Sequence, residues 1–300
     1  MLDLSVIILT YNEEIHIRRC IENIKTIAKE IFIVDSFSTD NTLEIAESLG
    51  AKVFQNKWEN NYARQFNWAL DNLPIQTQWI LRLDADEYIT SELICELQEN
   101  LSNLPNSVTG IILPLKRIFL GKWIKKGTGL VTQMRIFKYG KARCEIRLMD
   151  EHIELLEGKA IQFNGAWVDD NLNSLSWWTN KHIGYAIREA IDLLDIEYDL
   201  TGSATTDSLK ILSKEAINKR QTKHKYAQLA LFWRAFYYFI YRYIFKLGFT
   251  EGKEGFLWHF LQGWWYRTLV DAKIFEIKKA CGNDKKKIIS YIKENYNINL

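Results

Sequence analysis

Two aspartates stand two residues apart directly after an apolar run. The run is WILRL at residues 79–83, and Asp84, Asp86 and Glu87 follow it. A run without Pro or Gly predicts a strand buried on both faces, and open α/β sheets bind ligands beyond the carboxyl ends of their strands. In an extended segment, Asp84 and Asp86 share one side of the backbone and can hold a hard divalent cation. The pair therefore predicts a site for a diphosphate-bearing substrate; the alternative is a polar turn that caps the next helix.

The elements that must position this pair alternate between strand and helix. Apolar runs at 4–9, 30–34 and 51–54 predict three further strands, and apolar residues at helical spacing predict helices near 15–24, 41–49 and 62–73. Short loops between them favour βαβ units on a parallel sheet with right-handed crossovers. Neither GxGxxG after the first strand nor GxxxxGK[ST] occurs, so phosphate must be held another way. Beyond residue 109, short apolar runs broken by basic loops predict mixed or antiparallel strands.

Cysteine usage and the start of the chain bear on the compartment. Cys20, Cys95, Cys144 and Cys281 form no CxxC pair, which predicts reduced core thiols and a cytosolic redox compartment. The first strand begins at Leu4 without a basic leader, so we expect no signal peptide.

The C-terminal part is basic and aromatic. Residues 210–300 carry 18 Lys+Arg and 7 Asp+Glu, a net +11, and the first 209 residues carry −9. The aromatic segments 226–245 and 256–270 are disfavoured as membrane spans, since Arg234 and Arg242 would each cost about 2.5–3.5 kcal/mol at mid-membrane. They favour helices lying in the interface of an anionic membrane; the alternative is a helix pair packed on the catalytic domain. Nucleic acid is not the expected partner, because the aromatics lie in continuous apolar runs rather than on a charged groove.

Several motifs at strand ends occur in a familiar order. They are TYNE at 10–13, VDS at 34–36 with STDNT at 38–42, and LDADE at 83–87. Together they resemble the family 2 glycosyltransferases. FLGKWIKKG at 119–127, the Asp-Glu-His at 150–152 and KLGF-x-x-G from 246 further resemble a bacterial branch that includes lipopolysaccharide-core glucosyltransferases. One departure is DSFS at 35–38, where many members have Asp-Asp-Gly-Ser.

The resemblance implies an α/β chain with the GT-A nucleotide-diphospho-sugar transferase fold. This fold has a mostly parallel Rossmann-like sheet with a small antiparallel part, and here a C-terminal amphipathic helical region would follow it. We expect a catalytic domain at 1–200, with a nucleotide-sugar half at 1–105 and an acceptor half at 106–200. Residues 201–225 would be a linker, and 226–300 a membrane-association region.

The resemblance also implies roles for individual residues. Tyr11 would stack on a nucleobase, and Asp35 would accept the uracil imide N–H, which favours uridine. Asp84 would contact the ribose or the metal, and Asp86 would bind Mg²⁺ or Mn²⁺. A carboxylate must take the proton from the acceptor hydroxyl, and Glu151 is favoured over Asp150 for that role. The full nucleotide-sugar set implied is Thr10, Tyr11, Asn12, Glu13, Asp35, Arg64, Asn67 and Asp84.

The function implied is an inverting, metal-dependent glycosyltransferase. It would move a hexose from a nucleotide-diphosphate sugar, most simply a UDP-sugar, to a saccharide or lipid-linked acceptor for envelope or exopolysaccharide synthesis. The protein would be cytoplasmic and peripheral on the inner face of the membrane. Two alternatives are a polyprenyl-phosphate sugar transferase and a non-catalytic membrane scaffold that binds nucleotide sugars.

Overall fold

The computed structural model describes residues 1–146, 151–201, 214–298 and 300, with the side chains of 214–220 left aside. By its contacts the chain divides into two compact units. The N-terminal unit holds the described residues of Met1–Ile124 and Leu130–Leu172. The C-terminal unit holds Lys125–Gly129 and the described residues from Asn173 onward, apart from 214–215. The expected functional boundary at residue 200 stays a prediction.

The N-terminal unit alternates strands and helices in its first half and is mostly strand in its second. Its helices are α1 (Ile17–Ile24), α2 (Thr42–Ser48), α3 (Tyr62–Asn72), α4 (Ser91–Asn100) and the 3₁₀ turn η1 (Leu101–Asn103). Its strands are β1 (Leu4–Thr10), β2 (Glu30–Asp35), β3 (Lys52–Gln55), β4 (Trp79–Asp84), β5 (Glu87–Ile89), β6 (Val108–Phe119), β7 (Lys122–Trp123), β8 (Thr132–Lys138), β9 (Ala142–Cys144), β10 (Ile153–Leu155), β11 (Lys159–Gln162) and β12 (Trp167–Asp170).

Ten of these strands form one mixed sheet, and β9 pairs with β10 in a separate antiparallel ribbon. The main order is β3-β2-β1-β4-β8-β6-β12-β5, with β7 and β11 also paired to β6. Strands β1 to β4 run parallel, which brings the carboxyl ends of β1, β2 and β4 to one edge. Strand β8 is antiparallel to both β4 and β6. The predicted parallel half with an antiparallel part is confirmed.

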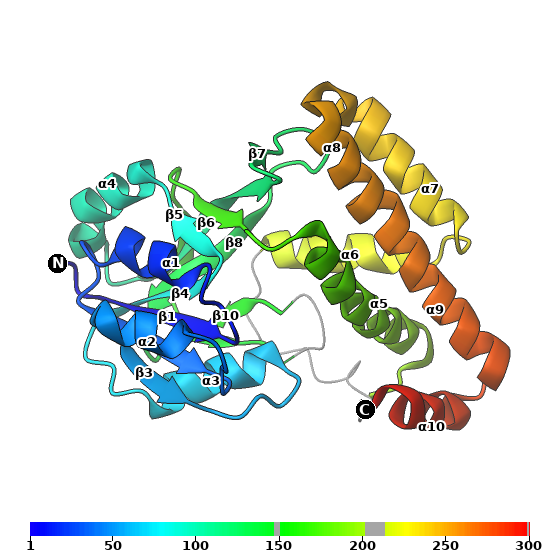
Figure 1. Cartoon of the computed structure of the whole chain (residues 1–300), viewed down its shortest axis with the longest axis horizontal. Helices are drawn as coiled ribbons and strands as arrows, with labels where there is room; N and C mark the ends of the chain where they lie inside the picture. The colour runs from blue at the N-terminus through cyan, green and yellow to red at the C-terminus, as the bar shows by residue number, and fades with distance from the viewer. Residues whose placement is uncertain (147–150, 202–213, 299) are drawn as a thin grey trace. The chain divides into compact units, whose positions relative to one another are not determined.

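Helices accompany the parallel strands of this unit (Figure 1). Two apolar clusters pack these helices and the β9–β10 ribbon onto the sheet. Alternate residues of β1 point to opposite faces, so Val6 and Ile8 pack with α1, α2 and α4, whereas Ile7 packs with α3 and the β9–β10 ribbon. Ile7, Ile8 and Leu81 have no exposed surface. The central strands are therefore buried on both faces, as their continuous apolar runs predict.

Two local predictions about this unit are wrong. The chain does not stay extended through Asp86, because Ala85 and Asp86 form a turn from β4 into β5. The positions of the two aspartate side chains relative to each other are therefore set by that turn and not by a strand pleat. All four cysteines are free, but Cys95 is exposed and so is not a core thiol.

The C-terminal unit is helical, and no described helix is long and apolar enough to cross a bilayer. Helix α5 starts after Ser174, whose hydroxyl caps the helix by accepting the Trp177 N–H at 3.2 Å. Helix α6 occupies part of the expected 201–225 linker, and residues 202–213 lie outside the described residues. The elements are α5 (Leu175–Tyr198), α6 (Lys214–Ala227), α7 (Trp233–Ile240), the π-helix η4 (Tyr241–Phe245), the 3₁₀ turn η5 (Gly248–Glu251), α8 (Gly252–Trp258), the π-helix η6 (His259–Trp265), α9 (Tyr266–Cys281) and α10 (Lys285–Tyr296).

The arginines of the aromatic segment are inside the protein. Arg234 is 3% exposed, and its Nη2 and Nε lie 2.5 and 2.8 Å from Oδ1 of the fully buried Asp271. The Asp271 carboxylate also accepts the backbone N–H of Phe232 at 2.7 Å. Arg242 is 5% exposed. These two arginines therefore do not face a membrane surface, because a buried acid neutralises the first and packing encloses the second.

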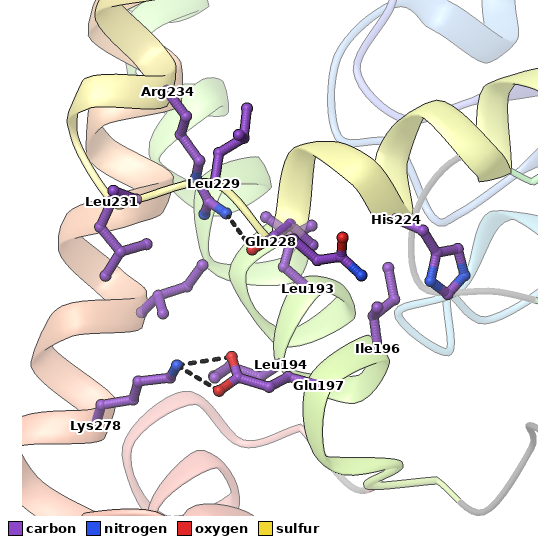
Figure 2. A pocket seen from close by; sticks show the side chains of 13 residues that line it. Leu193, Leu194, Ile196, Glu197, His224, Gln228, Leu229, Leu231, Arg234 and Lys278 are labelled. Carbon is purple, nitrogen blue, oxygen red and sulfur yellow. Dashed lines mark hydrogen bonds and ion pairs between the residues drawn. The ribbon is translucent and has the colours of Figure 1, made fainter.

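A pocket of about 570 Å³ lies in this unit (Figure 2). Six of its thirteen lining residues are leucines and isoleucines of α5, α9 and the segment before α7. Its charged groups are already engaged: Lys278 bonds both carboxylate oxygens of Glu197 at 2.7 and 2.6 Å, and Arg234 donates to the Ala227 carbonyl at 3.1 Å.

A buried histidine gives the C-terminal unit a pH-dependent stability. The His259 ring has no exposed surface and lies against Gly127 and Gly248, where an added Cβ would meet ring carbons at 2.1 and 2.5 Å. Gly127 also has a φ of +84°, so a side chain there is excluded twice. Burial, together with the positive charge of Arg242, lowers the pKa of His259 to about 4 from its ordinary 6.5.

We expect the protein to lose stability between pH 7 and pH 5 through this ring. The unfolded chain binds the proton more tightly than the folded one, so the stabilisation is present above pH 6.5 and is lost as the pH falls towards 4. The loss by pH 5 should be about 2 kcal/mol. Urea unfolding at both pH values measures it. His259→Gln should remove this part of the slope and the exposed-site control His224→Gln should keep it; equal slopes in all three proteins would contradict the assignment.

Candidate active site

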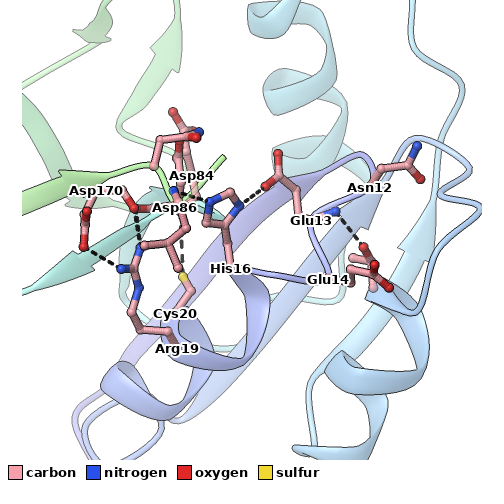
Figure 3. Close-up of polar contacts among 12 residues, drawn as sticks. Asn12, Glu13, Glu14, His16, Arg19, Cys20, Asp84, Asp86 and Asp170 are labelled. Atoms are coloured by element: carbon pink, nitrogen blue, oxygen red, sulfur yellow. Dashed lines mark hydrogen bonds and ion pairs between the residues drawn. The ribbon is translucent and has the colours of Figure 1, made fainter. Parts of the chain in front are cut away.

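The two aspartates of the LDADE motif lie at the carboxyl end of β4 (Figure 3). Asp84 is the last residue of the strand, and its backbone N–H donates to Oε2 of Glu87 at 2.8 Å. The Tyr62 hydroxyl, from α3, donates to the Asp84 carboxylate. Burial and the charge of Asp84 raise the pKa of Tyr62, so this hydroxyl keeps its proton as a donor. The strand and the helix together fix the orientation of Asp84.

Asp86 sits in the turn and is held from the other side. Its Oδ2 accepts the Asn171 amide at 2.8 Å, and its backbone carbonyl accepts Arg19 Nη2 at 3.1 Å. Arg19 also bonds Oδ2 of Asp170 at 2.6 Å, and the Asp170 backbone N–H donates to the Asp86 carbonyl at 3.2 Å. Helix α1 and the end of β12 thus clamp the turn through its backbone and one carboxylate oxygen.

The electrostatics of this corner fit a divalent cation. Burial raises the pKa of Glu87, and Asp84 and Asp86 raise it further against the opposing charge of Arg135, which donates to both Glu87 oxygens at 2.8 and 3.1 Å. Both aspartates therefore act on one buried group and concentrate negative charge there. Within the described residues no set of three or more His, Cys, Asp or Glu side chains could hold a metal. Two carboxylates suffice when substrate phosphates complete the shell, which is the usual arrangement for Mg²⁺.

Arg82 connects the predicted base to the aspartate pair. It lies on β4, is 8% exposed, and its guanidinium sits 4.2 Å from the centroid of the Tyr62 ring. Its Nη2 is 3.6 Å from Oε1 of Glu151. Burial opposes the charge on Arg82, but its neighbours, Asp84 and Glu151 among them, raise its pKa above the ordinary value. The structure thus brings Glu151 into the same electrostatic neighbourhood as Asp84. Asp150 lies outside the described residues.

The loops after β1 and β2 are joined to each other by side chains. Asp35 has no exposed surface and accepts three hydrogen bonds, from Thr10 Oγ1 at 2.8 Å, Ser38 N–H at 2.7 Å and Ser38 Oγ at 2.5 Å. Asn12 donates its N–H to Ser38 Oγ at 2.8 Å and accepts the Thr39 N–H at 2.8 Å. Asp35 therefore braces the loop, and its contact with a uracil stays a prediction.

Tyr11 and Glu13 flank Asn12 and have different surroundings. Tyr11 is 59% exposed, as a ring available for stacking must be. Glu13 donates its N–H to Thr42 Oγ1 at 2.7 Å, and its carboxylate lies 2.5 Å from His16 Nδ1. The fully buried His16 accepts the Leu172 N–H at its Nε2, 2.9 Å away. Glu13 and His16 thus link the β1 loop to the segment that holds Asp86.

The two α3 residues of the predicted site are not alike. Arg64 is exposed, and it pairs at 3.4 Å with Glu59, which is exposed too. Asn67 donates to the Cys144 carbonyl at 2.7 Å and accepts the Cys144 N–H at 2.9 Å. Asn67 therefore fixes Cys144, the last residue of β9. The nucleotide contacts expected of both residues stay predictions.

Sequence reasoning missed five residues that position the site. Arg82 left one signal, since it is a lone cation inside a strand with no other polar residue before Asp84. No signal in the sequence marks Arg19, His16 or Asn171, because their partners lie up to 156 residues away in the chain. The fifth is Tyr62, whose place at the start of a helix gives no hint of its bond to Asp84.

Comparison with known proteins agrees with this geometry. Residues 5–151 match the family described as Glycosyl transferase family 2. An "Uncharacterized glycosyltransferase" of Rickettsia bellii is 44% identical over 95 residues, which are 32% of this chain and 31% of that protein. The chain thus spans about a third of the length of such curated relatives.

Solved structures resemble the chain over about two fifths of its length. The mannosyl-3-phosphoglycerate synthase of Rubrobacter xylanophilus is 20% identical, with a TM-score of 0.33 over 39% of this chain and 41% of that one. The glucosyl-3-phosphoglycerate synthase of Mycobacterium tuberculosis, solved with Mn²⁺, UDP and glucosyl-3-phosphoglycerate, is 19% identical, with a TM-score of 0.30 over 39% and 44%. Residues 5–151, which match the family, hold nearly all of β1 together with β2 to β4 and the aspartate turn. The resemblance to a lipopolysaccharide-core branch stays a prediction. Residues 5–151 therefore form a family 2 glycosyltransferase region, as the motifs predict, and the sheet of the N-terminal unit has the parallel half and the antiparallel part expected of the GT-A fold.

Proposed function

We propose that the protein is an inverting, metal-dependent glycosyltransferase that moves a hexose from a UDP-sugar to a saccharide or lipid-linked acceptor. The observation that carries the proposal is the position of Arg82. This one buried guanidinium lies 3.6 Å from Glu151 and stacks on Tyr62, whose hydroxyl bonds Asp84. A candidate base and a candidate metal ligand are thus both close to one cation, and a single-displacement transfer needs these two groups in the same site.

Asp84 and Asp86 are the residues that would hold Mg²⁺ or Mn²⁺. A cation bound there would neutralise the charge that grows on the departing diphosphate. The chain itself contributes orientation: the Tyr62 hydroxyl donates to the Asp84 carboxylate, and the Asn171 amide donates to Oδ2 of Asp86. The base, Glu151, would take the proton of the acceptor hydroxyl as that oxygen attacks the sugar carbon and the carbon–oxygen bond to the diphosphate breaks.

The acceptor and the place of action are part of the same proposal. We place the enzyme at the inner face of a membrane, acting in envelope or exopolysaccharide synthesis. The support is the basic, aromatic character of the C-terminal unit, whose residues 216–250 contain no Asp or Glu at all. Such a surface suits an acceptor presented at an anionic membrane.

Turnover of nucleotide sugars tests the proposal directly. We expect at least one UDP-sugar to release UDP in the presence of Mn²⁺ and to raise the melting temperature. Donor at 100 times its Kd adds about 2.7 kcal/mol to the free energy of unfolding. Omitting the metal should remove most of both effects, and the matching CDP- and GDP-sugars serve as controls. If no nucleotide sugar stabilises the protein or is consumed with either metal, the proposal fails.

A further inference from the structure

The outer face of α7 and η4 carries a stripe of exposed aromatic rings. Its members recur at every fourth position, so they lie along one side of the helix. Trp233 and Tyr237 are each 62% exposed, Tyr241 is 49% and Phe245 is 72%. We call Trp233, Tyr237, Tyr241 and Phe245 the outer stripe. Rings as large as these are rarely left in contact with water in a row of four.

The inner face of the same helix carries its arginines. Arg234 and Arg242 are buried, as are Ala235 and Phe239. The ion pair of Arg234 with the fully buried Asp271 fixes the rotation of α7. Turning the helix would separate the two charges and leave each without its partner, which is costly for a buried pair. The helix is therefore inverted relative to an ordinary surface helix, because its arginines face the interior and the four rings of the outer stripe face outward. The exposure of the stripe is imposed by the fold.

The charge around the stripe selects among partners. No Asp or Glu occurs from residue 216 to residue 250. Lys225 and Lys246 are exposed cations of this stretch, whereas Arg234 and Arg242 are buried. Lys246 directly follows the stripe, is exposed, and lies 5.5 Å from the centroid of the Tyr241 ring. Trp and Tyr are the residues that settle at the depth of lipid headgroups, and neighbouring cations pair with anionic lipid there.

We propose that the outer stripe is the surface with which this protein docks on an anionic bilayer. The rings would enter the headgroup region with α7 parallel to the membrane plane, and Lys246 would contact lipid phosphate or carboxylate. This deepens the proposed function, on which it rests for the membrane-presented acceptor, by naming the face that meets the lipid.

Vesicle flotation of the full-length protein tests the assignment. The wild type should float with vesicles of phosphatidylcholine and phosphatidylglycerol and bind pure phosphatidylcholine more weakly. Changing all four stripe residues to Ser should lower the partition coefficient at least about tenfold on both. Lys246→Gln should weaken binding to the anionic vesicles alone, and 0.5 M NaCl should do the same. Leu130→Ser and Phe275→Ser, which change exposed apolar residues elsewhere, are the matched controls.

Several outcomes would overturn the proposal. Flotation of the fourfold variant like the wild type would exclude the stripe as the docking surface. A wild type that ignores both vesicles but loses an oligomeric state on the fourfold substitution would assign the stripe to a protein contact instead. Donor hydrolysis without vesicles separates this question from the proposed function: the fourfold variant should keep it, whereas Asp86→Ala should lose it and still float.

Discussion

Asp86→Ala is expected to reduce sugar transfer and donor hydrolysis at least about a hundredfold. The carboxylate is one of two that can ligate the cation, and nothing in the Asp86 turn replaces it. The fold should survive, because the turn is held through the Asp86 backbone carbonyl by Arg19 and by the Asp170 N–H. Rates of UDP release measure the activity, and the urea midpoint should shift by no more than about 1 kcal/mol in free energy.

The matched control for this change is Asp169→Asn. Asp169 lies on β12 beside the same turn, but it pairs with Arg117 at 3.2 Å and is partly exposed. Its loss should leave transfer within a factor of a few of the wild type. Calorimetry supplies the second readout, since Asp86→Ala should weaken Mn²⁺-dependent UDP binding. Full activity of the Asp86 variant would remove the metal role from the mechanism.

Glu151→Gln is expected to lower transfer by about a hundredfold to ten-thousandfold while UDP binding persists. The amide keeps the size of the side chain but cannot take a proton. It also loses the ion pair with Arg82, so a variant of that partner is informative. Arg82→Lys retains a cation beneath Tyr62 and should lose less activity than Arg82→Met. The exposed Glu157, which pairs with Lys141, provides the control Glu157→Gln.

The result with Glu151→Gln also decides between acceptors. A lipid phosphate needs no deprotonation at neutral pH, so unchanged transfer to polyprenyl phosphate would favour that alternative. If Asp150→Asn abolishes transfer instead, the base lies one residue earlier. If neither variant transfers sugar and both still bind the donor, both acids are essential to the transfer step.

The sequence predicts the fold well where local patterns and burial agree. Continuous apolar runs mark β1, β2 and β4, and helical spacing marks α1, because each of these elements is buried in the way its own pattern requires. Ser174 signals the start of α5 for the same local reason. The aspartate turn is found by its spacing, although the chain bends there and does not stay extended.

Long-range contacts decide what the sequence does not. Asp35 is expected to contact the uracil, and the structure adds that its two oxygens accept hydrogen bonds from Thr10 and Ser38. Asn67 is expected to contact the nucleotide, and the structure adds that it bonds Cys144 of β9. Arg234 suggests a cation for lipid phosphate until Asp271, 37 residues away, is seen to neutralise it. In each case a partner distant in sequence fixes the role of a polar group.

The segment Lys125–Gly129 has a consequence for how the chain acquires its structure. Its Lys126 N–H donates to Glu251 across 125 residues, and the Gly127 N–H donates to the Lys246 carbonyl. The C-terminal unit therefore closes only after nearly the whole polypeptide has left the ribosome, and its high contact order predicts slow maturation. Cutting the chain after α5 and expressing the remainder alone would leave His259 without Gly127, one of the two glycines against which its ring lies. The helical unit is thus expected to need the middle of the chain as a template, and secretion or display of the isolated C-terminal fragment should yield an unfolded product.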